Sequence, residues 1–496
     1  MRINKVTIRF WAISVVLVLV AASLTGLIFR SSDPFKAPAK VVVAKSIADF
    51  YKQEIEWRNC YGEFECTKYQ VPIDYSNLDL GTFDIAVLRK VSDTAIGNLV
   101  INPGGPGGSG VDYAYSYEQV FTPEIIKNFN IVGFDPRGVS RSAPIECLSD
   151  SETDEAYAAS AYPESDSELE KLRQDSAEYA KSCLKENKYL QHYGTANAAR
   201  DMDILRALLG DQKLNFLGKS YGTYLATLYA QLFPDQVGRF ILDGAVDPSL
   251  NSLDQALQQA VGFDQAFGAF VADCKLQSDC LFNNDPIFQM QSKLAELKKV
   301  PLEVGDRKLT ESLAVYGIAM GLYDQEFGWP ALRKALKNLF DGDGKLLLDM
   351  ADTYTGRDSD GTYQSNEADA LAVISCNDFP ESKIDADKVR AAAPLFGKYV
   401  AYGDLTCEYL PHGKFLTINV PIALSVSVLV IGTTNDPATP YQWAVKLAEI
   451  LDNSRLISLE SDGHTGYNRG SNCVDQAVEK YLISGDIPAE NLRCSA

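Results

Sequence analysis

The feature that most constrains this chain is a G-x-S-x-G motif, Gly218 to Gly222, between a strand-like run and a helix-forming run. Residues 214–217 have the apolar character of a short buried strand, and residues 221–233 carry small and apolar side chains at helical spacing. A serine at such a strand-to-helix turn is strained and exposed, and flanking glycines avoid clashes with neighbouring backbone. Ser220 is therefore a candidate nucleophile, although a plain glycine-rich turn is the alternative.

Strand-like and helical segments alternate through the first half of the chain. The expected strands there are residues 83–89, 98–102, 131–134, 214–217 and 240–243. With a helical pattern at 196–209, this alternation predicts an α/β fold with a mostly parallel sheet covered by helices. From about 250 to 405 the pattern becomes predominantly helical, and strand signals resume near Ile418. We therefore expect a helical cap, residues 250–405, inserted between core segments at 56–249 and 406–496.

The chain has only three histidines, which restricts the search for a general base. Where a serine occupies such a turn, the acid and then the histidine follow it in the chain. His192 precedes Ser220, and His412 leaves no room for an acid at the end of a preceding strand. His464 lies in a loop directly after the strand-like residues 455–459, where a general base is expected. His464 is therefore the predicted base.

The acid is expected at the end of the preceding strand. Residues 422–433 form the strongest β-type run of the chain and lead into Asp436. Asp436 would orient the imidazole of His464 and stabilise its protonated form. The alternatives are Asp452, in an expected helix, and Asp462, which is too close in sequence to His464 to end another strand. An aspartate before proline is also common in ordinary turns.

A glycine-rich loop, residues 103–110, follows the expected strand at 98–102. Such a loop could cradle a phosphate, but it lacks the Gly-Lys-Ser/Thr ending of a nucleotide-binding loop. We expect it to stabilise an oxyanion instead, with backbone amides of Gly105 and Tyr221 as the two donors. These groups predict acyl transfer through a covalent serine intermediate, with no cofactor and no metal.

These motifs resemble the prolyl and tripeptidyl aminopeptidase family of α/β-hydrolases, and the secreted bacterial tripeptidyl branch most of all. The resemblance covers roughly residues 55–496 and is loose between about 250 and 400. Pro103 stands where proline iminopeptidases carry a histidine, which favours the tripeptidyl branch. The segments that carry the resemblance are residues 57–75, Gly104 to Gly108, Asp135 to Ser142, Gly218 to Gly222, Asp462 to His464, and 473–494.

The resemblance implies an α/β-hydrolase fold and a serine exopeptidase that releases short peptides, expected to be tripeptides, from free N-termini. A secreted carboxylesterase or lipase with the same triad, and a prolyl aminopeptidase, remain alternatives. A catalytically silent binding module is disfavoured because the triad and the oxyanion loop are all present. An aminopeptidase needs a carboxylate at a fixed distance from Ser220, and the candidates are Asp378 and Glu326 in the cap.

Three other side chains are expected to be structural. Asp135 and Arg137 are expected to form a pair that braces the turn after their strand. Thr439 is expected to brace the Asp436 loop by a hydrogen bond. Neither Asp135 nor Arg137 is expected to contact substrate.

The beginning of the chain is a targeting segment. Three basic residues precede an uncharged apolar run, residues 10–29. Residues 1–30 are thus expected to be a signal peptide cleaved after Ala22, or an uncleaved membrane anchor, followed by a linker at 31–55. Either alternative exports the protein to the periplasm, the cell surface or the medium.

The net charge of −20 argues against nucleic-acid binding and against adsorption on anionic lipid. Peptides are the expected partners, the N-terminal segment is the only expected membrane contact, and a monomer is expected. Ten cysteines in an exported chain imply disulfides, and no C-x-x-C motif indicates zinc or redox chemistry. Neighbouring cysteines are expected to pair as Cys60–Cys66, Cys147–Cys183, Cys274–Cys280, Cys376–Cys407 and Cys473–Cys494.

Overall fold

The computed structural model describes residues 34–35, 39–40, 42, 44–282, 284–379, 385–418 and 420–496. The expected targeting segment, residues 1–30, lies outside the described residues, and the expected linker is described only in part. Within the described ranges, no helix is long and apolar enough to cross a membrane. The same ranges contain no group of three or more histidine, cysteine or acidic side chains that could hold a metal ion.

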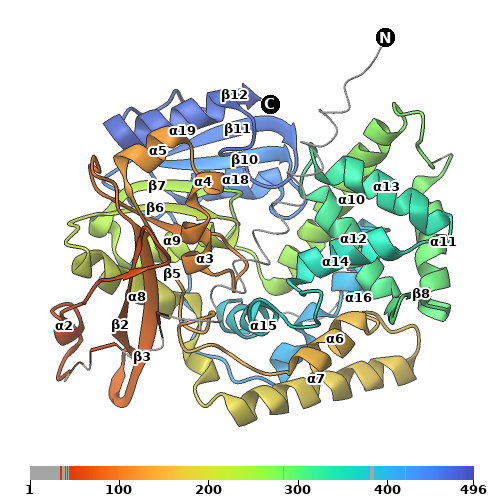
Figure 1. Cartoon of the computed structure of the whole chain (residues 1–496), viewed down its shortest axis with the longest axis horizontal. Coiled ribbons are helices and arrows are strands. Elements are labelled where there is room, and N and C mark those ends of the chain that lie inside the picture. The colour runs from red at the N-terminus through yellow and green to blue at the C-terminus, as the bar shows by residue number, and fades with distance from the viewer. Residues whose placement is uncertain are drawn as a thin grey trace.

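A ten-stranded sheet, counted over the described residues, forms the centre of the core, to the left of the helical cap in Figure 1. Its order is β1 (Arg58–Cys60), β2 (Phe64–Asp74), β3 (Asn77–Lys90), β5 (Asn130–Phe134), β4 (Asn98–Asn102), β6 (Leu214–Lys219), β7 (Val237–Asp243), β10 (Val428–Asn435), β11 (Ser454–Asp462) and β12 (Leu492–Ser495). β1, β2, β3 and β5 pair antiparallel in turn, and every later pair is parallel. The mostly parallel α/β sheet predicted from the sequence is confirmed.

The expected strand at 422–433 begins only at Val428. Ile422 lies outside the sheet, where it forms an isolated bridge to Leu451 and donates its amide to Ile450. Its apolar side chain is buried among the helices beside the sheet. The apolar run thus predicted burial of this segment correctly, but the strand is shorter than the run.

Side chains of the central strands alternate between two covered faces of the sheet. In β4, Val100 packs on one face, whereas Leu99 and Ile101 pack on the other. Burial on both faces explains the continuous apolar runs of these strands. The first face is covered by α8 (Thr195–Leu208), α9 (Tyr221–Leu232) and α18 (Tyr441–Ile450), and the second by α3 (Gly110–Tyr115), α4 (Tyr117–Val120), α5 (Pro123–Asn128) and α19 (Asn472–Ser484).

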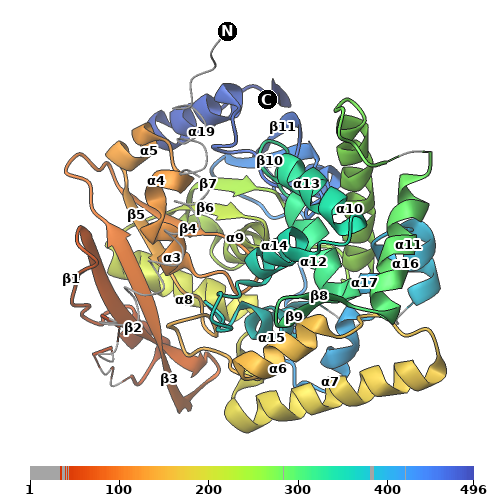
Figure 2. The ribbon, with the colours of Figure 1, turned by 45° about the vertical axis from the view of Figure 1, so that its right-hand side comes forward.

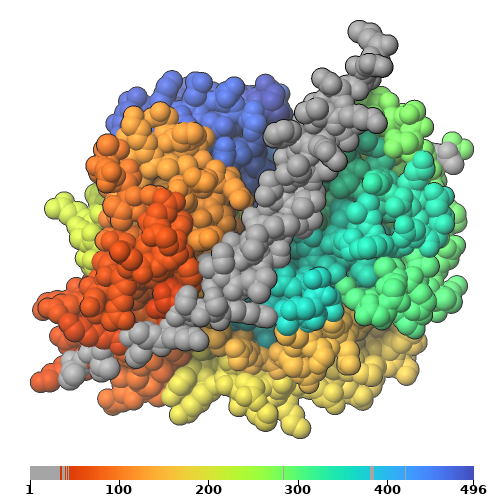
Figure 3. Space-filling view, in the orientation of Figure 1, coloured from red at the N-terminus to blue at the C-terminus, as the bar shows by residue number. Residues whose placement is uncertain are grey.

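A helical cap with its own buried cluster lies beside the sheet (Figures 1 and 2). In the surface view, the green and teal cap lies opposite the red and orange start of the core (Figure 3). The cap contains α10 (Ser252–Cys274), α11 (Pro286–Lys299), the hairpin β8 (Leu302–Val304) and β9 (Arg307–Leu309), α12 (Glu311–Leu322), α13 (Gly328–Phe340), α14 (Lys345–Thr355), α16 (Ala386–Ala392) and α17 (Gly397–Val400).

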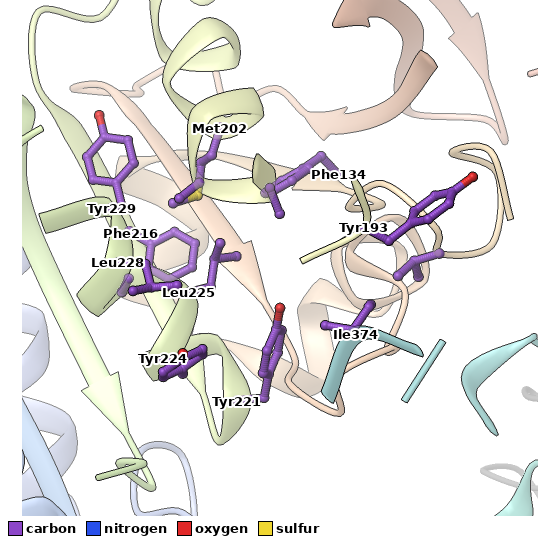
Figure 4. Close-up of a cluster of buried hydrophobic side chains, with 14 of the residues drawn as sticks. Phe134, Tyr193, Met202, Phe216, Tyr221, Tyr224, Leu225, Leu228, Tyr229 and Ile374 are labelled. Carbon is purple, nitrogen blue, oxygen red and sulfur yellow. The ribbon is translucent and has the colours of Figure 1, made fainter. Parts of the chain in front are cut away.

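The boundary of the cap differs from the expected range of 250–405. α15 (Glu367–Asp378) packs on the core, where its Ile374 joins the buried cluster around Tyr221 and Tyr224 (Figure 4). Conversely, Tyr157 of α6 (Asp150–Ala158), before the expected cap, packs against the cap cluster. Helical periodicity indicates that a segment is a helix but not which of two cores it packs against.

All ten cysteines form the five expected disulfides. The expected pair of Asp135 with Arg137, by contrast, is wrong. The fully buried Arg137 forms an ion pair with Asp201 of α8 at 2.6 Å, and Asp135 pairs with Arg141 at 3.2 Å. The partner of Arg137 lies 64 residues away in sequence, so no local pattern could identify it.

Candidate active site

Ser220 lies at a sharp turn between β6 and α9, with a left-handed φ of 54°. Its amide donates a 2.8 Å hydrogen bond to the carbonyl of Asp243 on β7. A Cβ at Gly218 would lie 2.5 Å from the carbonyl oxygen of Gly222, and one at Gly222 would lie 2.9 Å from the side chain of Asn102. Both flanking glycines are therefore needed for this strained turn, which is the geometry of a nucleophile elbow.

Asp436 and His464 follow the neighbouring strands β10 and β11, and their side chains meet. The Nδ1 atom of His464 lies 2.9 Å from each carboxylate oxygen of Asp436. The amides of Ala438 and Thr439 donate to one oxygen, and the Thr439 hydroxyl and the Thr465 amide donate to the other. The expected bracing by Thr439 is confirmed, and both oxygens of the buried carboxylate are held in place.

The turn at Asp243 and Gly244 brings Ser220 and His464 to the same edge of the sheet. Asp243 accepts the Ser220 amide, and a Cβ added at Gly244 would lie 3.2 Å from Cε1 of His464. Among the described residues, no hydrogen bond joins the Ser220 hydroxyl to His464, as is common in active sites without substrate. The elbow and the histidine loop are nevertheless immediate neighbours.

A buried charge pair that the sequence analysis missed fixes the histidine loop. The carboxylate of Asp243 accepts the amides of Gly466 at 2.7 Å and Tyr467 at 3.0 Å. Lys219 donates to the Tyr467 carbonyl at 3.0 Å, and its Nζ lies 3.7 Å from Asp243. Burial lowers the pKa of Lys219, although the charge of Asp243 opposes this effect. A lysine inside an otherwise apolar elbow was the sequence signal for this contact.

The glycine-rich loop lies directly against the elbow. Gly104, Gly105 and Gly107 have φ values of 112°, 106° and 112°, and a Cβ at Gly104 would lie 2.9 Å from Cβ of Ser220. The Gly104 amide donates to Asn102, whereas the amides of Gly105 and Tyr221 have no acceptor within the described residues. These two amides are therefore available to an oxyanion beside Ser220.

The cap contacts the histidine loop through Tyr323, at the end of α12. The rings of Tyr323 and His464 are 5.3 Å apart and nearly perpendicular, and the His464 amide donates to the Tyr323 carbonyl at 2.9 Å. Arg469 forms a 2.8 Å ion pair with Asp324, the next cap residue. Sequence reasoning could not find this contact, because Tyr323 lies 141 positions before its histidine partner in the printed chain.

Comparison with known proteins agrees with this geometry, since residues 97–468 match the α/β hydrolase fold family. The chain belongs to the α/β-hydrolase family. This hydrolase is 36% identical over 479 residues to serine protease Hip1 of Mycobacterium tuberculosis, covering 89% of this chain and 91% of that protein. It is 34% identical over 455 residues to carboxylesterase B of M. tuberculosis, covering 87% of this chain and 86% of that protein.

The hydrolase is also 30% identical over 499 residues to a tripeptidyl aminopeptidase of Streptomyces coelicolor, covering 94% of this chain and 90% of that protein. The resemblance to that family is therefore confirmed. The relatives include peptidases and an esterase, so the chain is a serine hydrolase whose substrate class is a peptide or an ester.

The two carboxylates expected to bind a substrate N-terminus have different surroundings. Asp378 is only 9% exposed, and it accepts hydrogen bonds from the amide and the hydroxyl of Thr195. Burial raises the pKa of Asp378 to about 7. The Thr195 hydroxyl also contacts the Tyr221 hydroxyl, so Asp378 supports the elbow helix from behind and is not open to a ligand. Glu326 is exposed and has no hydrogen bond or ion pair within the described residues.

Proposed function

We propose that this hydrolase is an exported serine exopeptidase that releases short peptides, expected to be tripeptides, from free N-termini. The observation that carries the proposal is the Asp436–His464 pair beside the Ser220 elbow, with a cap residue, Tyr323, against the histidine. A cap that approaches the nucleophile from one side favours cleavage near the end of a peptide substrate over cleavage at its internal bonds. The similarity to a tripeptidyl aminopeptidase supports the same substrate class.

In this proposal Ser220 transfers its proton to His464 and attacks the scissile carbonyl carbon. The amides of Gly105 and Tyr221 hold the resulting oxyanion. Asp436 keeps the imidazole oriented and stabilises its protonated form. His464 then gives the proton to the leaving amine, and water activated by the same histidine hydrolyses the acyl-enzyme.

Export is supported by the five disulfides, which are typical of proteins that fold outside the cytoplasm. Secretion, the periplasm and the cell surface are all compatible with such a framework. The acidic net charge supports peptides rather than nucleic acid as partners.

A carboxylesterase is the second candidate, because a relative of this name is 34% identical over most of the chain. The chemistry up to the acyl-enzyme is identical for an ester, and only the leaving group differs. The two candidates are separated by comparing hydrolysis of short acyl esters with that of peptides.

The deciding experiment uses protein lacking residues 1–30 and a peptide mixture in free-amine and N-acetylated forms, with products identified by mass spectrometry. Tripeptides released only from free amines, and absent with Ser220→Ala, are the expected result. Release of single residues would change the assignment to a prolyl-type aminopeptidase. Ser220-dependent ester hydrolysis without peptide cleavage would favour the esterase.

A further inference from the structure

A carboxylate that no sequence motif singled out, Glu367, lies against the glycine-rich loop. It begins α15, which packs on the core, and its backbone and Cγ lie next to Gly107. A Cβ added at Gly105 would be 3.3 Å from Oε1 of Glu367. The carboxylate is therefore a near neighbour of the amide that we assign to the oxyanion.

The carboxylate of Glu367 has no hydrogen-bond or ion-pair partner within the described residues, whereas its amide donates to the Ser365 hydroxyl. The residue is exposed to solvent. The surrounding protein nevertheless desolvates the group enough to raise its pKa. An exposed but partly desolvated carboxylate without a partner is suited to bind a cation.

A row of aromatic rings in the cap begins at the catalytic histidine, and the charge of Glu367 acts on two of its members, Tyr323 and Tyr354. The Tyr323 ring packs edge-on against the His464 ring, with 5.3 Å between the ring centroids, and its centroid lies 6.0 Å from that of Tyr354. Tyr354 in turn lies 5.5 Å from Tyr316. Burial chiefly, with a contribution from the charge of Glu367, raises the pKa of the Tyr323 and Tyr354 hydroxyls. Tyrosine faces and a carboxylate together are the usual surroundings of an ammonium group.

A lone negative charge beside an oxyanion loop would oppose catalysis, because the tetrahedral intermediate is also negative. A bound cation removes this conflict. We propose that Glu367 binds the ammonium group of the substrate's free N-terminus, next to the oxyanion loop that contains Gly105. This inference rests on the proposed peptidase function and assigns to Glu367 the role that sequence reasoning gave to Asp378 or Glu326.

The position of Glu367 also limits the length of the released fragment. A Cβ lies about 2.5 Å from its own amide nitrogen. One hydrogen bond of about 3 Å joins that amide to the oxyanion, and another joins the carboxylate to the ammonium. Oε1 of Glu367 lies 3.3 Å from that Cβ position at Gly105. The ammonium nitrogen and the carbonyl oxygen of the scissile bond can thus be at most about 12 Å apart. Three extended residues span about 10–11 Å and four about 13–14 Å. An extended substrate would lose three residues or fewer.

The test compares Glu367→Gln with wild type on Ala-Ala-Ala-p-nitroanilide and its N-acetylated form. We expect the ratio of kcat/KM for the free amine to that for the acetylated substrate to fall about tenfold or more. The acetylated substrate should react faster with the variant, because the carboxylate no longer opposes the oxyanion. The matched control is Glu178→Gln, at an exposed glutamate of α7 (Asp166–Glu186), which should leave the ratio as it is. A fall of the ratio in Glu326→Gln but not in Glu367→Gln would overturn the proposal.

If Glu367 had a purely structural role, Glu367→Gln would lower kcat/KM equally for the free-amine and the acetylated substrate. That result would overturn the proposal. A loss confined to acetyl-Ala-Ala-Lys-p-nitroanilide would overturn it too, since the bound ammonium would then be a lysine side chain. Efficient release of tetra-alanine from Ala-Ala-Ala-Ala-p-nitroanilide would refute the length limit. If wild type hydrolyses p-nitrophenyl butyrate in a Ser220-dependent manner but no anilide, the peptidase function itself fails, and the inference fails with it.

Discussion

The Nδ1 atom of His464 lies equally close, at 2.9 Å, to both carboxylate oxygens of Asp436. Each oxygen also receives two further hydrogen bonds, from the 438–439 turn and from Thr465. An imidazole held this way has its Nδ1 proton directed at the acid and Nε2 free to act on a serine.

Replacing Asp436 by Asn should reduce kcat for ester hydrolysis by roughly 10⁴-fold, because the amide favours the wrong histidine tautomer. Burst kinetics with p-nitrophenyl butyrate would measure the loss. Asp452→Asn, in an exposed turn after α18, is the matched control and should keep wild-type kcat. A mild effect of Asp436→Asn would remove Asp436 from the triad.

Asp243→Asn should lower both activity and stability. The variant keeps one acceptor for the two loop amides and leaves Lys219 buried without its counter-charge. We expect the free energy of unfolding to fall by about 3 kcal/mol. Urea unfolding and ester kcat, measured on the same sample, check this. Unchanged kcat in a destabilised variant would show that Asp243 does not position the histidine loop.

Arg137→Ala should be among the most destabilising single changes. Both Arg137 and Asp201 are fully buried, so removing the arginine leaves an uncompensated charge, at a cost of about 3–5 kcal/mol. Arg58→Ala removes an exposed pair with Glu56 and should change stability by less than about 1 kcal/mol. Thermal unfolding of the two variants would compare them, and similar midpoints would contradict the expectation.

Asp378 should make stability depend on pH. Its folded pKa of about 7 is above that of an unfolded aspartate, so the folded state binds the proton more tightly. Its contribution to stability is complete below about pH 4 and is lost as the pH rises through about 7. That loss is at most about 4 kcal/mol.

Asp378→Asn does not titrate, so its stability relative to wild type should improve steadily from pH 4.5 to pH 8. Urea unfolding at four pH values would follow the difference between the two proteins. A difference that does not vary with pH would mean that Asp378 is ionised in the folded protein throughout this range.

Local patterns carried much of the prediction. The G-x-S-x-G turn indicated the elbow because a strand, a strained serine and a helix must occur there in immediate succession. Chain order and the scarcity of histidines then selected Asp436 and His464, which the structure brings into contact. Pairing each cysteine with its neighbour in the chain matched the five disulfides of the structure, although ten cysteines allow many other pairings.

The sequence alone thus determined the α/β architecture and the candidate triad, since each depends on short segments or on the order of strands. It indicated that the cysteines form disulfides, and the structure showed which cysteines pair. Only the tertiary structure decided the partner of Arg137, the placement of α15 on the core, and the approach of Tyr323 to His464. It also placed Glu367 beside Gly105, more than 250 positions away in the chain. These contacts join side chains from distant segments, and which ones meet depends on how helices and strands pack in three dimensions, a relationship that periodicity and spacing do not encode.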